Sequence, residues 1–112
     1  MSSQRIISYA LDDLVVDPDG AIDALNDACT HRQVHYRVSG ICQLEHRVYF
    51  ALAPVADPRA AGNYLLVTVE DTSHDGFVSM LDDRWAAGFD IVGTITLYET
   101  VMALFARPPE RK

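Results

Sequence analysis

YRVSGICQLEHRVYFALA, residues 36–53, is matched 53 positions later by FDIVGTITLYETVMALFA, residues 89–106. Both stretches begin with an aromatic residue, carry a glycine at the fifth position (Gly40 and Gly93) and place apolar residues at nearly every second position. Such alternation is typical of β-strands, and the short polar break in the middle of each stretch is typical of a hairpin turn. Self-similarity at a fixed spacing indicates that one structural unit occurs twice.

An apolar run that ends in carboxylates precedes each hairpin. The runs cover residues 5–11 and 64–70, and their alternation predicts one strand in each half of the chain. The carboxylates at or just after these strands are Asp12 and Asp13 in the first half, and Glu70 and Asp71 in the second.

Helix signals follow the carboxylates in both halves. Asp17 and Ser73 are suited to accept hydrogen bonds from the free N–H groups of a first helical turn, and Pro18 suits the first helical position. We expect the first helix to run to about residue 32 and the second to end at Gly88, in the left-handed conformation. Each half is therefore predicted to be a βαββ unit.

These elements predict an α+β fold made of tandem βαββ repeats. The arrangement is expected to be a ferredoxin-like sandwich or a pseudo-dimeric antiparallel sheet with two helices. Because one half alone would bury too little apolar surface, we expect a single domain over residues 1–112. Repeat 1 covers about 5–54, a linker rich in proline and small residues covers 55–63, and repeat 2 covers about 64–107.

The stretch from residue 85 to residue 107 resembles a small bacterial family of uncharacterised βαββ domains. Members of that family show Gly-Trp-Glu-Leu-Val after the helix and a closing Phe-x-Arg. The corresponding residues here are Gly88-Phe89-Asp90-Ile91-Val92 and Phe105-Ala106-Arg107, whereas the first half has His35-Tyr36-Arg37-Val38. The resemblance covers about half of the chain; it implies the βαββ fold and assigns no catalytic residue.

Composition narrows the classes of partner. The net charge of −7 repels phosphate backbones, so no nucleic-acid partner is expected. No segment approaches the roughly 20 apolar residues of a membrane span, and the first residues lack the apolar stretch of a signal peptide. We therefore expect a cytoplasmic protein that binds no membrane. The two cysteines, Cys29 and Cys42, are predicted to be buried thiols.

The repeated carboxylates are candidate ligand-binding residues. Asp12, Asp13, Glu70 and Asp71 have the chemistry to hold a hard cation, or to transfer protons if one were partly buried. A solvated loop that brings negative charge to a helix N-terminus is the simpler interpretation. Arg37 is a candidate for binding an anion on the open sheet face.

Other ligand chemistry has less support in the sequence. His31 and His35 are spaced as a helical pair, but no second pair of ligands accompanies them. We therefore predict no metal and no cofactor.

The sheet faces opposite the helices carry apolar residues where water would favour polar ones. The predicted interface residues on these faces are Tyr49, Val92, Met102 and Leu104. A second sheet of the same chain or another subunit is expected to cover them, and a cleft between the halves would be a ligand groove.

These observations favour a noncatalytic binding or assembly module. It would form a homo-oligomer, such as a dimer, through sheet surfaces, and would bind a small ligand or a protein. The alternative is a small enzyme with a carboxylate-lined cleft between the repeats. The first hypothesis is preferred because the sequence sets no serine or cysteine nucleophile beside a recognisable base.

Overall fold

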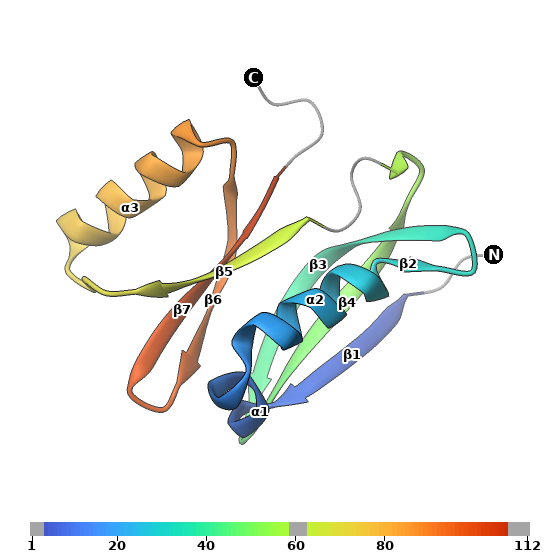
Figure 1. Cartoon of the computed structure of the whole chain (residues 1–112), viewed down its shortest axis with the longest axis horizontal. Helices are drawn as coiled ribbons and strands as arrows, with labels where there is room; N and C mark the ends of the chain where they lie inside the picture. Colours follow the sequence, from blue (N-terminus) through green and yellow to red (C-terminus); the bar gives the residue numbers. More distant parts are fainter. Residues whose placement is uncertain (1–3, 59–62, 108–112) are drawn as a thin grey trace.

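A computed structural model describes residues 4–58 and 63–107 of the chain (Figure 1). Their strands form two antiparallel sheets, which we name sheet A (order β1-β4-β3-β2) and sheet B (order β5-β7-β6). Together with three helices they confirm an α+β protein. The elements are β1 (Arg5–Ala10), α1 (Leu11–Val16), α2 (Pro18–Ala28), β2 (Thr30–His31), β3 (Val34–Leu44), β4 (Arg47–Val55), β5 (Tyr64–Val69), α3 (His74–Ala86), β6 (Asp90–Leu97) and β7 (Thr100–Ala106).

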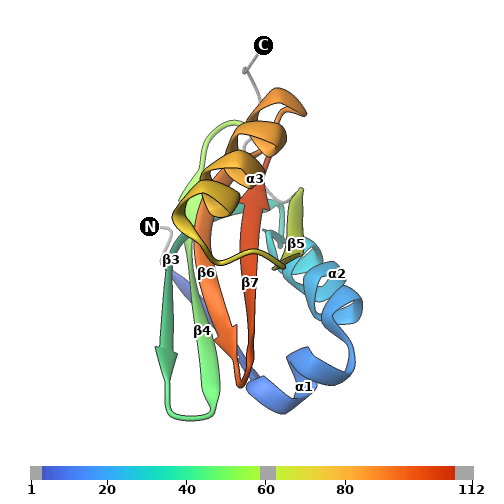
Figure 2. The same ribbon diagram turned by 90° about the vertical axis from the view of Figure 1, so that its left-hand side faces the viewer.

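The two sheets share one pattern of strand pairing. In each, the first strand pairs with the last, and the last also pairs with the strand before it in sequence. The predicted hairpins are confirmed, and both turn through a residue with positive φ, Glu45 at 54° and Tyr98 at 56°. The hairpins lie with their turns at the same end of the molecule (Figures 1 and 2). Because the described strands divide between two sheets, they form no single ferredoxin-like sheet.

Both hairpins contain a β-bulge, although the alternation of apolar residues predicted regular strands. The register shifts between Val38 and Gly40 in β3, and at the matching place in β6. An extra residue reverses the faces of all side chains beyond it. Ile41 therefore packs against the core and Cys42 is exposed, so the prediction of a buried Cys42 is wrong. Cys29 is fully buried, as predicted.

The segment between β1 and α2 is a helix rather than the predicted loop. Leu11 and Leu14, three positions apart, are only 5% and 1% exposed and bring one side of α1 into the core. The chain thus has three helices among its described residues, where two were expected. Further along, α2 ends at Ala28, earlier than predicted, because Thr30 pairs with His35 in a short ladder.

The main core lies between the two sheets and beneath α2 (Figures 1 and 2). It takes residues from α1, α2 and the inner face of sheet A, and from the face of sheet B that points away from α3. Its buried members are Leu11, Leu14, Leu25, Cys29, Tyr36, Val38, Val48, Phe50, Leu52, Tyr64, Ile95, Leu97, Met102 and Leu104.

Three of the four predicted interface residues belong to this interior. Leu104 is 0% exposed, Met102 is 8% exposed, and Val92 packs against the same cluster. The chain's own first half therefore covers the face of sheet B on which they lie. Only Tyr49 among the predicted interface residues lies on a face that the described chain leaves open.

Helix α3 covers the other face of sheet B with a smaller cluster. Phe77, Met80 and Leu81 pack there against a group that includes Phe105, yet no residue of α3 is buried. The helical spacing of Leu81 and Trp85 predicts that both side chains press onto the sheet. This prediction is wrong for Trp85, which is 57% exposed. The guanidinium of Arg84 lies 6.0 Å from the centre of the Phe105 ring and takes the place expected for the indole.

Two side-chain amides join the halves at the edges of sheet B. Gln43 donates to the carbonyl of Thr96 at 2.5 Å and accepts from its N–H at 3.1 Å. Asn26 accepts from the N–H of Tyr64 at 2.7 Å and donates to its carbonyl at 3.3 Å. The amides satisfy backbone groups that an edge strand otherwise leaves unpaired. No helix in the described part of the chain is long and apolar enough to cross a bilayer.

Candidate functional site

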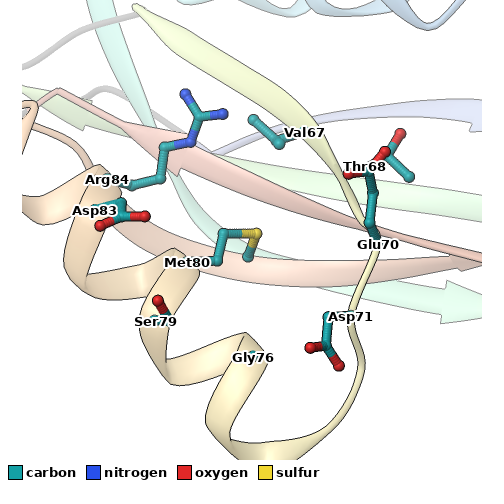
Figure 3. Close-up of a pocket in the computed structure, with 9 residues that line it drawn as sticks. All are labelled: Val67, Thr68, Glu70, Asp71, Gly76, Ser79, Met80, Asp83 and Arg84. Atoms are coloured by element: carbon teal, nitrogen blue, oxygen red, sulfur yellow. The ribbon is translucent and has the colours of Figure 1, made fainter.

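The carboxylates of the second half line an open groove of about 430 Å³ between β5 and α3 (Figure 3). Asp71 accepts a hydrogen bond from the N–H of Ser73 at 3.0 Å. Hydrogen bonds from the Ser73 side chain and backbone lower the pKa of the Asp71 carboxyl. A Cβ at Gly76 would clash with the carboxylate of Asp71, so glycine lets this carboxylate sit against the first turn of α3. Asp71 therefore has a structural role at the start of this helix.

The remaining lining of this groove mixes opposite charges. Glu70 lies toward one end of the groove, Arg84 and Asp83 lie toward the other, and Met80 lies between them (Figure 3). Ser79 is also on the helical wall, but the described residues that line the groove include no histidine or lysine that would act as its base. Among the described residues, no group of three or more His, Cys, Asp or Glu is placed to hold a metal ion.

The carboxylates of the first half lie elsewhere. Asp12 accepts a hydrogen bond from the hydroxyl of Tyr98, and this bond raises the pKa of the tyrosine. Asp13 lines a separate groove beside α1 and α2. A groove of about 700 Å³ lies between α1 and the β6–β7 turn, and among its described lining residues Glu99 alone bears a carboxylate. The structure thus does not bring Asp13 together with Glu70 and Asp71 in one cleft.

Arg37 and Tyr49 share the face of sheet A that points away from α2, which we name the outer face. Its residues alternate along β4 with the buried Val48, Phe50 and Leu52, and they pair with one another across the strands. The outer face consists of Ile6, Ser8, Ala10, His35, Arg37, Gly40, Cys42, Leu44, Arg47, Tyr49, Ala51, Ala53 and Val55.

The outer face is apolar and basic on an acidic protein. Ile6 is 58% exposed and Leu44 is 64% exposed, while Tyr49 is half-buried. None of the 16 Asp and Glu residues of the chain lies in β1, β3 or β4. The charges of the outer face are those of Arg37 and Arg47. Arg47 donates a hydrogen bond to the hydroxyl of Ser8 at 2.8 Å.

A second exposed apolar region lies at the end of α3. Trp85 and Ile91, 57% and 40% exposed, line an open groove of about 370 Å³, which we name the Trp85 groove. Its other lining residues are Leu81, Asp82, Phe89 and Asp90. Sequence reasoning missed this region because it assigned Trp85 to the core. A signal for its exposure was present in the sequence. Helical spacing places Phe77, Met80, Leu81 and Arg84 in one stripe along α3, and Trp85 lies at the margin of this stripe.

Comparison with protein-family models, curated proteins and solved structures found no match to this chain. The resemblance to uncharacterised βαββ domains stays a prediction, and the candidate sites rest on the chain's own geometry.

Proposed function

We propose that this protein is a noncatalytic assembly module that self-associates through the outer face of sheet A. The observation that supports this most directly is the difference between the sheet faces. Both faces of sheet B pack against described parts of the chain, and the inner face of sheet A lines the main core. The outer face has no such cover, yet it presents Ile6, Leu44 and Tyr49 without a single carboxylate. Exposed apolar sheet faces mark interaction surfaces.

The proposal includes a duplicated βαββ unit as the origin of the two halves. Matching strand order, matching bulges and matching turns support this interpretation. Duplication would produce two similar sheets. Sheet B has both of its faces covered by described parts of the chain, whereas the outer face of sheet A is not covered in this way. The predicted cytoplasmic location and the predicted small ligand or protein partner remain part of this proposal.

The size of the outer face sets the expected affinity. The three strands β1, β3 and β4 have 6, 11 and 9 residues. At about 4.8 Å between strands and about 3.4 Å per residue, they give a face about 15 Å wide and about 20–37 Å long. Standard stable interfaces bury roughly 800 Å² on each partner, which is more than such a face supplies alone. We therefore expect reversible, concentration-dependent association rather than an obligate oligomer.

The alternative of a small enzyme with a carboxylate-lined cleft between the repeats has less support. It needs the carboxylates of both halves to converge, but Asp13 lines one groove and Glu70 and Asp71 line another. The bond from Tyr98 gives Asp12 a partner within the chain.

A charge placed on the outer face tests the proposal. Ile6→Asp puts a carboxylate at the exposed edge of this face, and Val16→Asp makes the same kind of change on α1, where Val16 is 84% exposed. Size-exclusion chromatography with light scattering, over a range of concentrations, should show self-association of the wild type and of Val16→Asp. Ile6→Asp should remain a monomer with an unchanged circular dichroism spectrum. Association of Ile6→Asp equal to that of the wild type would reject the outer face as the interface.

A further inference from the structure

We infer that self-association is head-to-tail: the outer face of one copy binds the Trp85 groove and the adjoining surface of α3 on a second copy. This inference rests on the proposed function and adds the identity of the partner surface. Three independent features of the chain support it: the packing between its own halves, the distribution of charge, and the exposure of Trp85.

The packing between the halves already contains this type of contact. Met102 and Leu104, on the face of sheet B that joins the main core, stand 53 positions after Tyr49 and Ala51 of the outer face. The outer face of sheet A thus corresponds to the face of sheet B that is buried against the helix-bearing side of the first half. Asn26 of α2 completes that contact.

Among the described residues, no element covers the helix-bearing side of the second half in the same way. Eight positions after its cap, α2 carries Leu25, which is 0% exposed, whereas the corresponding Leu81 of α3 is only half-buried. Four positions further on, Cys29 is 0% exposed and Trp85 is 57% exposed. Each copy therefore presents two surfaces, the outer face of sheet A and the α3 side of the second half. The surfaces that correspond to them, one face of sheet B and the α2 side of the first half, pack together within the chain. A contact between two different surfaces is heterologous, and it continues into a ring or an open chain of copies.

The charges of the two surfaces are complementary. The outer face carries Arg37 and Arg47 and no acidic residue, while Asp82 and Asp83 are exposed on α3. Opposite potentials favour the head-to-tail contact. A symmetric contact between two outer faces would instead gather the arginines of both copies on one interface, where strands β1, β3 and β4 supply no carboxylate.

Trp85 is suited to anchor this contact. Tryptophan, tyrosine and arginine dominate the residues that contribute most to binding at protein interfaces. Trp85 supplies an exposed indole on one surface, and Tyr49 and Arg37 supply the matching residue types on the other. Loss of the indole should weaken self-association at least about tenfold.

Mixing two variants tests the head-to-tail arrangement. Ile6→Asp disables the outer face and leaves the Trp85 groove intact, whereas Trp85→Asp does the reverse. Each variant alone should be a monomer by light scattering. An equimolar mixture should form a one-to-one dimer, because one intact copy of each surface remains and neither partner can add another subunit. Asp82→Lys replaces Trp85→Asp as the second partner if the tryptophan variant fails to fold by circular dichroism.

The other outcomes separate this inference from the proposed function. If the α3 variants self-associate like the wild type while Ile6→Asp is monomeric, the contact is symmetric, and the head-to-tail arrangement is overturned while the proposed function stands. If both variants are monomers and their mixture forms no dimer, the head-to-tail arrangement is also overturned. If the wild type is a monomer at every concentration, the proposed function fails and this inference fails with it.

Discussion

At the scale of single residues, two of the side chains predicted to act chemically, Asp12 and Asp71, have structural roles. Asp71 accepts bonds from Ser73 at the start of α3, and Asp12 accepts a bond from Tyr98 across the two halves. Their residue types and their repetition were visible in the sequence. Their partners were not, because Tyr98 lies 86 positions from Asp12. Carboxylates that occupy similar places in the sequence therefore end in different grooves.

The contact between Asp12 and Tyr98 predicts a pH dependence. The bond to the carboxylate, aided by burial, raises the pKa of Tyr98 above its usual value. The stabilisation from this bond is thus present below the ordinary tyrosine pKa of about 10 and is lost as pH rises through the folded value. Asp12→Asn should lower the pKa of Tyr98 toward the ordinary value, as followed by NMR of its ring carbons. An unchanged Tyr98 pKa in this variant would contradict the contact.

At the scale of the elements, local signals predicted the hairpins and the helix caps well. Asp17 accepts from the N–H of Gly20 at 3.0 Å, and Ser73 accepts from that of Gly76 at 3.2 Å. The short helix α1 was missed because its two aspartates resemble a loop, although its leucines have helical spacing. The bulges were missed because alternation alone carries no information on where a strand changes register. The local traces of the bulges were the repeated glycines and the apolar residues beside them, Ile41 and Val92, which break the alternation.

The two long helices should differ in their contribution to stability. Leu25→Ala and Leu81→Ala remove the same atoms at corresponding helical positions, but Leu25 is fully buried and Leu81 is half-buried. Leu25→Ala should lower the free energy of unfolding by about 2–5 kcal/mol, the usual range for a buried leucine. Leu81→Ala should cost clearly less, because fewer of its contacts are lost. Urea denaturation of both variants measures this difference, and equal losses would contradict the loose packing of α3.

At the scale of the whole molecule, one face of sheet B packs against the helix-bearing side of the first half, where it meets α1, α2 and the inner face of sheet A. The sequence indicated that apolar sheet faces needed a cover, and left a second sheet or another subunit as the alternatives. Sheet B is covered within the chain, so Met102 and Leu104 lie in the core, whereas Tyr49 remains on an open face. Strand patterns show which residues share a face. They do not show which face the other half of the same chain will cover.

Charge across the whole molecule predicts that association depends on salt. The outer face is basic and α3 is acidic, and exposed charges are screened over about 8 Å at physiological ionic strength. Self-association should weaken as sodium chloride is added, as measured by light scattering at a fixed protein concentration. Association that strengthens steadily with salt would indicate a purely apolar contact and would contradict the proposed charge complementarity.

Sedimentation equilibrium of the untagged wild-type protein tests the central claim most directly. The chain has a mass of 12.4 kDa. Self-association through the outer face predicts an average mass that starts near this value in dilute solution and rises steadily with concentration. A mass that stays at 12.4 kDa into the millimolar range would contradict the account.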